Sequence, residues 1–411
     1  MKSRFYRTYF SVTVLFLVLC SFVFAKIALA TEPIKIGIIA EEGTLAGKAI
    51  ANSAQLAADE INAHGGINGR PIKLFIYDDH VKATDAVEDF QRAVYQHHVV
   101  AVVGSWVSEI ALALEPWAAR LHTIYITTGA ASPNITELVY KDYNQYKYVF
   151  MTWLNSYFLA ESSCDFAKDS LVKQYGIKTA YILSENAAWT KSLDYEYLKC
   201  LPQSGIKVVG HIRFAPNTKD FQPIFNSVVE KHAEMVIGGI AHSGMNAIVQ
   251  WHQGKLPFLF TGVISEASSP GFWQETGGAT EGIITSAGTS MSPITPKTIP
   301  FAKAYIKKFG SNPPYTGYVT YDTINILANA IQRAKTTNTD ALINALEATN
   351  YVGVMGHIEF YGKDSPFVHD VKYGKNYIVS PAVQWQHGKL ETVWPENAAT
   401  SKVILPSFVK K

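Results

Sequence analysis

Residues 57–79 read AADEINAHGGINGRPIKLFIYDD. Gly65-Gly66 predicts the end of a helix, because glycine readily enters the left-handed conformation that closes one. Asn68-Gly69 predicts a tight turn, and Pro71 fits the start of a strand, where losing one amide donor costs little. The strand then runs out into Asp78-Asp79. The stretch therefore predicts a helix, a turn and a strand, with the polar end of the strand at the carboxyl edge of a sheet.

Apolar runs of strand length alternate with helical patterns in two successive series. The first series predicts strands at 35–40, 72–77, 99–103 and 123–127, and the second predicts strands at 179–183, 207–214, 235–238 and 258–262. The tail adds helices at 301–310, 321–334 and 340–348 and a strand pair at 378–386 and 390–393. This rhythm is typical of parallel sheets covered by helices on both faces. The predicted fold class is therefore α/β, with two doubly wound parallel-sheet lobes.

The amino-terminal segment has the layout of a secretory signal. Lys2, Arg4 and Arg7 give a positive start, 12–25 is an almost unbroken apolar run, and Ala28-Leu29-Ala30 offers a small-x-small cleavage site. This order is typical of a cleavable signal peptide. We therefore expect residues 1–30 to be removed and the mature protein to be periplasmic.

Two other interpretations of this segment are open. An uncleaved membrane anchor is disfavoured, because the apolar run is short for a span of about 20 residues. A lipoprotein anchored at Cys20 is also disfavoured, because Leu19 stands where a small residue is needed. Cleavage would leave Cys164 and Cys200, and an exported protein can oxidise them to a disulfide or keep two free thiols.

Composition limits the classes of function. The 411 residues are 48% hydrophobic and 17% charged, which is enough for two packed cores. The net charge of +2 gives no electrostatic case for a nucleic acid partner. No Cys or His cluster has the spacing of metal ligands, so no metal or cofactor is expected.

The motifs of common enzymes are absent from the sequence. No Gly-x-Gly-x-x-Gly follows the first strand, and there is neither a P-loop nor a Gly-x-Ser-x-Gly elbow. Asp78-Asp79 is a poor acid–base pair, because neighbouring residues on a strand point to opposite faces. We therefore do not expect an enzyme, and a hydrolase or oxidoreductase on two α/β lobes is the least favoured hypothesis.

The pattern E-I-N-A-x-G-G-I-N-G-R-P-I followed by D-D closely resembles the periplasmic binding proteins for branched-chain amino acids. These are type I solute-binding proteins of bacterial ABC importers. Segments 99–104 with Ser108, 126–136, 318–330 and 356–360 are similar to further motifs of that family, in the same order. The resemblance covers nearly the whole mature chain.

The resemblance implies that the chain crosses between the lobes three times. We place the crossings near Thr152, Ser286 and Gly356. The first lobe then comprises 31–152 plus 286–356, and the second comprises 153–285 plus 357–411.

The ligand is expected in the cleft outside the carboxyl ends of the strands. In the first lobe the candidate residues lie in the loops that follow the strands. Ser108 fits either a hydroxyl donor to a ligand carboxylate or a simple helix cap, and Ala131 stands where the family has a threonine. The first-lobe candidates are Glu41, Ser105, Trp106, Ser108, Thr128, Gly129 and Ala131.

In the second lobe Trp189 aligns with a family aromatic that covers the ligand, and Ile240 stands near a second one. Ile264 aligns with the glutamate that binds the ligand's ammonium group in the family, and Glu266 lies two residues on. A buried ammonium without a carboxylate is costly. Either Glu266 takes the role, or Glu41 or Glu42 supplies the charge, or the ligand carries no amine.

The expected function is capture of a small carboxylate-bearing solute, such as a branched-chain amino acid, by a monomeric receptor. The resemblance implies delivery to a membrane permease and its ATPase. Two alternatives stay open: a receptor of the same fold for an aromatic acid, which Trp106 and Trp189 would suit, and a ligand sensor for a signalling partner.

Overall fold

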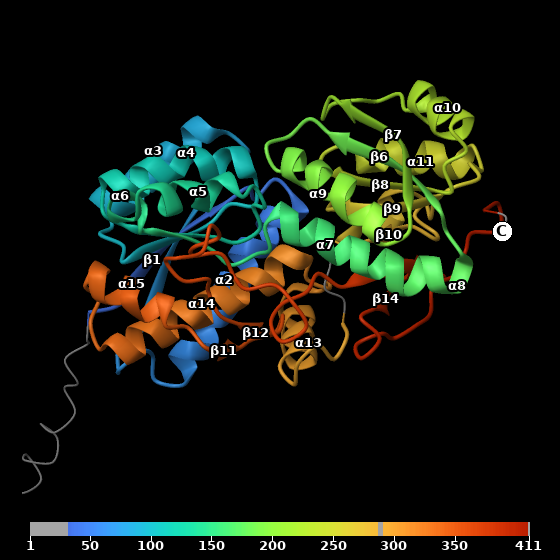
Figure 1. Ribbon diagram of the computed structural model, residues 1–411. Helices are drawn as coiled ribbons and strands as arrows, with labels where there is room; N and C mark the ends of the chain where they lie inside the picture. The colour runs from blue at the N-terminus through green and yellow to red at the C-terminus, as the bar shows by residue number, and fades with distance from the viewer. Residues whose placement is uncertain (1–31, 287–290, 410–411) are drawn as a thin grey trace, which may run out of the picture.

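The computed structural model describes residues 32–286 and 291–409, so the predicted signal segment 1–30 and Cys20 lie outside the described residues. Two parallel sheets form the centres of two lobes that lie side by side (Figure 1). Among the described residues, no helix combines the length and the apolar character that a membrane crossing needs.

The first sheet has five parallel strands in the order β2-β1-β3-β4-β5. Helices α3 and α4 cover one face, and α2 and α14 cover the other (Figure 1). Its strands are β1 (Ile34–Ala40), β2 (Ile72–Asp78), β3 (Ala101–Gly104), β4 (Ile124–Thr127) and β5 (Val149–Met151). Its helices are α2 (Leu45–Ala63), α3 (Ala83–Tyr95), α4 (Ser108–Arg120), α5 (Asn134–Lys141), α6 (Tyr143–Tyr146), α13 (Thr298–Phe309), α14 (Tyr315–Ala334) and α15 (Thr339–Glu347).

The second sheet has four parallel strands in the order β7-β6-β8-β9. Its strands are β6 (Thr179–Glu185), β7 (Lys207–Phe214), β8 (Met235–Ile240) and β9 (Leu259–Ile264). Its helices are α7 (Ser156–Phe166), which continues through a π-helix (Ala167–Val172) into α8 (Lys173–Tyr175), α9 (Thr190–Gln203), α10 (Gln222–Glu230), α11 (Gly244–Gln253) and α12 (Phe272–Glu275). Cys164 on α7 and Cys200 on α9 form a disulfide.

The opening stretch folds as the sequence predicts. Gly66 and Gly69 have φ of 72° and 81°, and Asn68 has φ of 51°. Ile67 and Arg70 exchange two backbone hydrogen bonds of 2.8 and 3.0 Å across the turn. A Cβ on Gly66 would lie 2.2 Å from the Arg70 carbonyl oxygen, so this position requires glycine. The turn thus joins α2 directly to β2.

The tail returns to both lobes. Helix α14 packs on α2 of the first lobe. Strands β13 (Ala382–Gln386) and β14 (Lys389–Trp394) form an antiparallel sheet with β10 (Ile284–Thr285), which lies beside β9 of the second lobe. The predicted strand 378–386 starts only after Pro381, because proline cannot donate to the strand ladder.

The third crossing lies later in the chain than the sequence predicts. Beyond Gly356, β12 (His357–Ile358) still pairs with β11 (Tyr351–Val352), which follows α15. Asp370 then pairs with Met151 at the end of β5. Parts of the segment 357–371 therefore pair with elements of the first lobe, while Tyr361 and Phe367 pack on Phe158 of α7. The prediction placed the whole segment in the second lobe. The sequence of this segment has no clear strand or helix periodicity, so it did not show which lobe the segment packs on.

Candidate functional site

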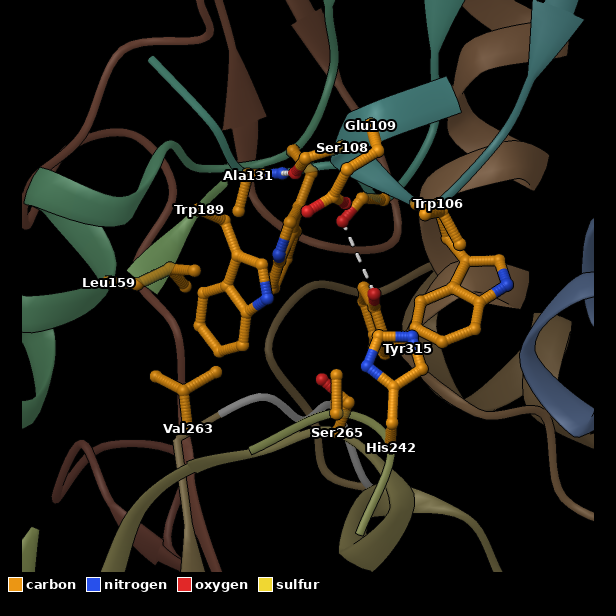
Figure 2. A pocket seen from close by; sticks show the side chains of 14 residues that line it. Trp106, Ser108, Glu109, Ala131, Leu159, Trp189, His242, Val263, Ser265 and Tyr315 are labelled. Carbon is orange, nitrogen blue, oxygen red and sulfur yellow. Dashed lines mark hydrogen bonds between the residues drawn. The ribbon is translucent and has the colours of Figure 1, made fainter. Parts of the chain in front are cut away.

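A cavity of about 400 Å³, counted with its open side, lies between the two lobes. Loops that follow β3 and β4 approach it from the first lobe, and loops that follow β6, β8 and β9 approach it from the second (Figure 2). It is lined by Trp106, Val107, Ser108, Glu109, Gly129, Ala131, Trp153, Leu159, Trp189, Ala241, His242, Val263, Ser265 and Tyr315.

Four large aromatic side chains line the cavity. Trp106 follows β3, Trp189 precedes α9, Trp153 lies just after β5, and Tyr315 begins α14. The rings of Trp153 and Tyr315 are 5.3 Å apart, centroid to centroid. The Tyr315 hydroxyl donates to the Gly129 carbonyl over 3.2 Å, as the dashed line in Figure 2 shows. Such walls favour the apolar or aromatic part of a small ligand.

Ser108 links the loop after β3 to the loop after β4 at the cavity. Its Oγ accepts hydrogen bonds from the amides of Ala131 and Ser132, both over 3.2 Å. The cap of α4 is Val107, without a capping side-chain bond, so the helix-cap interpretation of Ser108 is wrong. A serine oxygen that takes two amide donors still has its own proton to give. Ser108 is therefore equipped to donate to an acceptor in the cavity.

Gly129 fits tightly behind Trp106. A Cβ at this position would lie 2.8 Å from Trp106 Cβ and 3.0 Å from Thr316 Cγ2. The absence of a side chain lets the loop after β4 approach the loop after β3. The close packing of these two loops is therefore the steric reason for a glycine at position 129.

His242 lines the cavity from the second lobe and is held by a buried carboxylate. Its Nδ1 lies 2.9 Å from Glu185 Oε1. The amides of Ala241 and His242 donate to Glu185 Oε2 over 3.0 and 3.1 Å. The hydrogen bond to Glu185 raises the pKa of His242. Its ring stacks on that of Trp106 at 5.8 Å, which is a contact between the lobes.

Glu109 makes a second contact between the lobes. It occupies the first turn of α4, and its Oε1 accepts a hydrogen bond of 2.8 Å from the Ala188 amide beside Trp189. Figure 2 shows the Glu109 side chain directed into the cavity. Sequence reasoning missed this residue, although its place directly after Ser108 at a strand-to-helix junction was a usable signal.

The structure brings together Trp106, Ser108, Gly129, Ala131 and Trp189 of the predicted site residues. The other predicted first-lobe residues lie behind the cavity wall. Glu41 and Ser105 are fully buried, and Ser105 Oγ donates to Glu41 Oε1 over 2.7 Å. Burial, together with the charge of Asp79, raises the pKa of Glu41 to about 8. Thr128 is fully buried as well. Glu41, Ser105 and Thr128 are thus not among the residues that line the cavity.

Two predicted second-lobe residues, Ile240 and Ile264, are misplaced by strand alternation. Ile240 and Ile264 point into the core of the second lobe, whereas Val263 and Ser265 line the cavity. Neighbouring residues of a strand face opposite sides, so an error of one position exchanges core and cavity. Glu266 Oε2 accepts from the Met245 amide over 3.1 Å, and burial raises its pKa. Glu266 is not among the residues that line the cavity.

Several lining residues were absent from the prediction. Some of them lie at the ends of β3, β8 and β9 or in the loops that follow these strands, and the others come from α4, α7, α14 and the segment after β5. These residues are Val107, Glu109, Trp153, Leu159, Ala241, His242, Val263, Ser265 and Tyr315. In the ranges 32–286 and 291–409, no group of three or more His, Cys, Asp or Glu side chains is arranged to hold a metal ion.

A family model described as periplasmic binding protein matches residues 33–375. The chain belongs to the periplasmic binding protein family. It is 26% identical over 404 residues to the Leu/Ile/Val-binding protein homolog 7 of Brucella abortus (strain 2308), with 93% of this chain and 96% of that protein covered. The family assignment agrees with the resemblance stated from the sequence.

Two solved structures show the same fold. The branched-chain amino acid transporter substrate binding protein of Streptococcus pneumoniae, in complex with isoleucine, superposes with a TM-score of 0.74 at 22% identity, covering 89% of this chain and 100% of that one. A solute binding protein from Rhodopseudomonas palustris BisB5, in complex with 3,4-dihydroxybenzoic acid, superposes with a TM-score of 0.70 at 21% identity, covering 87% and 95%. Periplasmic binding proteins of this fold thus include an amino acid complex and an aromatic acid complex.

Proposed function

We propose that this periplasmic binding protein captures a small carboxylate-bearing solute between its lobes and delivers it to a membrane permease with its ATPase. The observation that carries the proposal is the cavity itself. Loops from both lobes contribute its walls, and Trp106, Trp189 and His242 face the same small volume. The named relatives support an importer as the destination.

Closure follows from this arrangement. Each lobe holds only half of the contacts, so a ligand binds fully only when the lobes are together. A ligand that contacts both halves stabilises the closed form over the open one. The direct contacts of Glu109 with Ala188 and of Trp106 with His242 mark where the halves meet. We propose that the closed form is what the permease receives.

The ligand is proposed to be an amino acid with an apolar side chain, as in the relatives named for Leu, Ile and Val. An aromatic acid is the second candidate, because tryptophan rings line the cavity and one structural neighbour holds 3,4-dihydroxybenzoic acid. Export by cleavage after Ala30 belongs to the same proposal. A sensor that feeds a signalling partner would use the same cavity, and permease genes beside this one would favour transport.

Thermal unfolding and X-ray scattering with a ligand panel test the proposal. The panel contains leucine, isoleucine, valine, phenylalanine, benzoate and 3,4-dihydroxybenzoate, each at millimolar concentration. A ligand present at 100 times its Kd should stabilise the protein by about 2.7 kcal/mol, and closure should reduce the radius of gyration. A panel in which nothing changes either quantity contradicts the proposal.

A further inference from the structure

We propose that Glu109 and His242 select a zwitterion, with the ligand's amine bound by Glu109 and its carboxylate bound by His242. The inference rests on the proposed function, because it names the charge pattern of the solute that the same cavity receives. It assigns a role to two residues that the sequence did not single out as ligand contacts.

The charges of the lining support this pattern. Among the fourteen described residues that line the cavity, Glu109 is the one carboxylate and His242 is the one imidazole. Glu109 comes from the first lobe and His242 from the second. A ligand with one positive and one negative group therefore meets a complementary charge on each lobe.

The neighbouring carboxylates Glu185, Glu266 and Glu41 do not line the cavity. Glu185 is fully buried and holds the His242 ring and two backbone amides. Glu266 binds the Met245 amide at the start of α11, and Glu41 accepts from Ser105 behind the wall. A buried ammonium requires a carboxylate or an equivalent partner. Glu109 is the one carboxylate among the described residues that line the cavity. Its Oε1 accepts from the Ala188 amide, and its Oε2 is the oxygen we assign to a ligand amine.

The Glu109 carboxylate also disfavours binding of the ligand carboxylate at the amino terminus of α4. The amino terminus of a helix favours an anion, and in α4 the Glu109 carboxylate already stands in this first turn. A second carboxylate at the same end would be repelled by the first. The indole faces of the cavity suit the cationic nitrogen instead, through cation–π attraction. The anionic end of the ligand is thereby directed to the other lobe.

His242 is oriented to receive that end. Because Glu185 engages Nδ1, the Nε2 nitrogen is left to donate to an anion when the ring is protonated. The hydrogen bond to Glu185 is the main cause of the raised pKa of His242. Burial of the ring opposes this rise, and the charges of Glu185, Glu109 and Glu266 add to it. The same interaction fixes the ring direction, as carboxylate partners of histidine do at metal sites. The inferred ligand is an α-amino acid with an apolar or aromatic side chain.

Matched ligand pairs test the inference by calorimetry at about pH 6.5. One pair is leucine and 4-methylpentanoate, and the other is phenylalanine and 3-phenylpropanoate, so each pair differs in the amine alone. The wild-type protein should bind the amine-bearing member about 10- to 100-fold more tightly. Glu109→Gln should abolish this preference, whereas His242→Gln should weaken both members of each pair. Glu137→Gln, an exposed carboxylate on α5 that pairs with Lys141, is the matched control and should change neither.

The outcomes separate this inference from the proposed function. If the wild-type protein binds the members of a pair equally, or prefers the one without the amine, the inference is overturned and the proposed function stands. The same holds if Glu109→Gln folds and keeps the preference. If no member of either pair and no ligand of the wider panel binds, the proposed function itself fails. The comparison of paired ligands uses the wild-type protein alone. The inference can therefore be contradicted even if Glu109→Gln does not fold.

Discussion

His242 links the proposed ligand site to pH. Its pKa is raised by the hydrogen bond to Glu185, and Glu109, Glu266 and the Trp106 ring also face it. Because the folded pKa lies above the unfolded one, the ring is protonated below about pH 6.5 and loses its charge as pH rises through the raised value. We expect ligand affinity to be highest at low pH and to fall in that window. Titrating Kd from about pH 5.5 to about pH 9 should show this decline in the wild type. A decline that persists unchanged in His242→Gln would assign it to another group.

Gly129 is a residue whose replacement should damage binding more than folding. An alanine Cβ would lie 2.8 Å from Trp106 Cβ and 3.0 Å from Thr316, so one of the two loops must shift. Overpacking of this kind costs about 1–3 kcal/mol of stability, and the shift displaces a cavity wall. We expect Gly129→Ala to lose most of the ligand-induced thermal shift. Gly43→Ala, where nothing lies within 4 Å of the new Cβ, should keep it.

At the residue scale the sequence predicted some of the site residues that follow strand ends. It missed Ala241 and His242 after β8 and Ser265 after β9, and it missed residues that come from distant segments. Trp106, Ser108 and Trp189 were found because a strand-to-helix loop is recognisable locally. Trp153 and Tyr315 were missed because they approach the cavity from segments far apart in the chain. Ile264 was predicted in place of Val263 because a fully buried strand does not show in its sequence which side chains face the cavity.

Among the elements, the Cys164–Cys200 disulfide ties α7 to α9 on the second lobe. The two cysteines are 36 residues apart, and the chain-entropy relation gives a loop of this length about 3–4 kcal/mol. We expect the Cys164→Ser/Cys200→Ser double variant to unfold at lower urea, by roughly that free energy. Reducing the wild type should reproduce the loss, and reducing the double variant should have no further effect. Equal midpoints for oxidised wild type and double variant would contradict the prediction.

Periodicity predicted most elements because it is a local property. Apart from β5, the parallel strands of both sheets appear close to the predicted positions, since apolar runs between helical patterns identify buried strands. The two- and three-residue strands β10 and β5 carry too little pattern to be recognised. The predicted helix 157–175 contains a π-helix at Ala167–Val172, which apolar spacing does not distinguish from an α-helix.

At the scale of the whole molecule, hydrogen bonds connect the segments in which the chain crosses between the lobes. Asp370, fully buried on the third segment, accepts from Thr136 on α5 over 2.7 Å and from Asn155 at the start of α7 over 2.6 Å. Ser380 exchanges hydrogen bonds of 3.1 and 2.9 Å with Ser162 on α7, and its hydroxyl donates to the Ser286 carbonyl. The sequence indicated that crossings exist but not these side-chain bonds, which join residues more than 90 positions apart.

Asp370 therefore offers a test of how the hinge holds the lobes. Asp370→Ala would leave the Asn155 amide and the Thr136 hydroxyl buried without this acceptor, at about 1–3 kcal/mol for each unsatisfied group. Because one partner belongs to a first-lobe helix and the other begins a second-lobe helix, the loss should also loosen the hinge. We expect a lower urea midpoint, a larger radius of gyration without ligand, and weaker ligand binding, while the ligand-bound dimensions stay those of the wild type. Asp364→Ala, an exposed residue of the same segment, should change none of these. If Asp370→Ala lowered stability but left the unliganded dimensions and the affinity unchanged, Asp370 would only support packing, and hinge stiffness would have to come from the Ser162, Ser286 and Ser380 bonds.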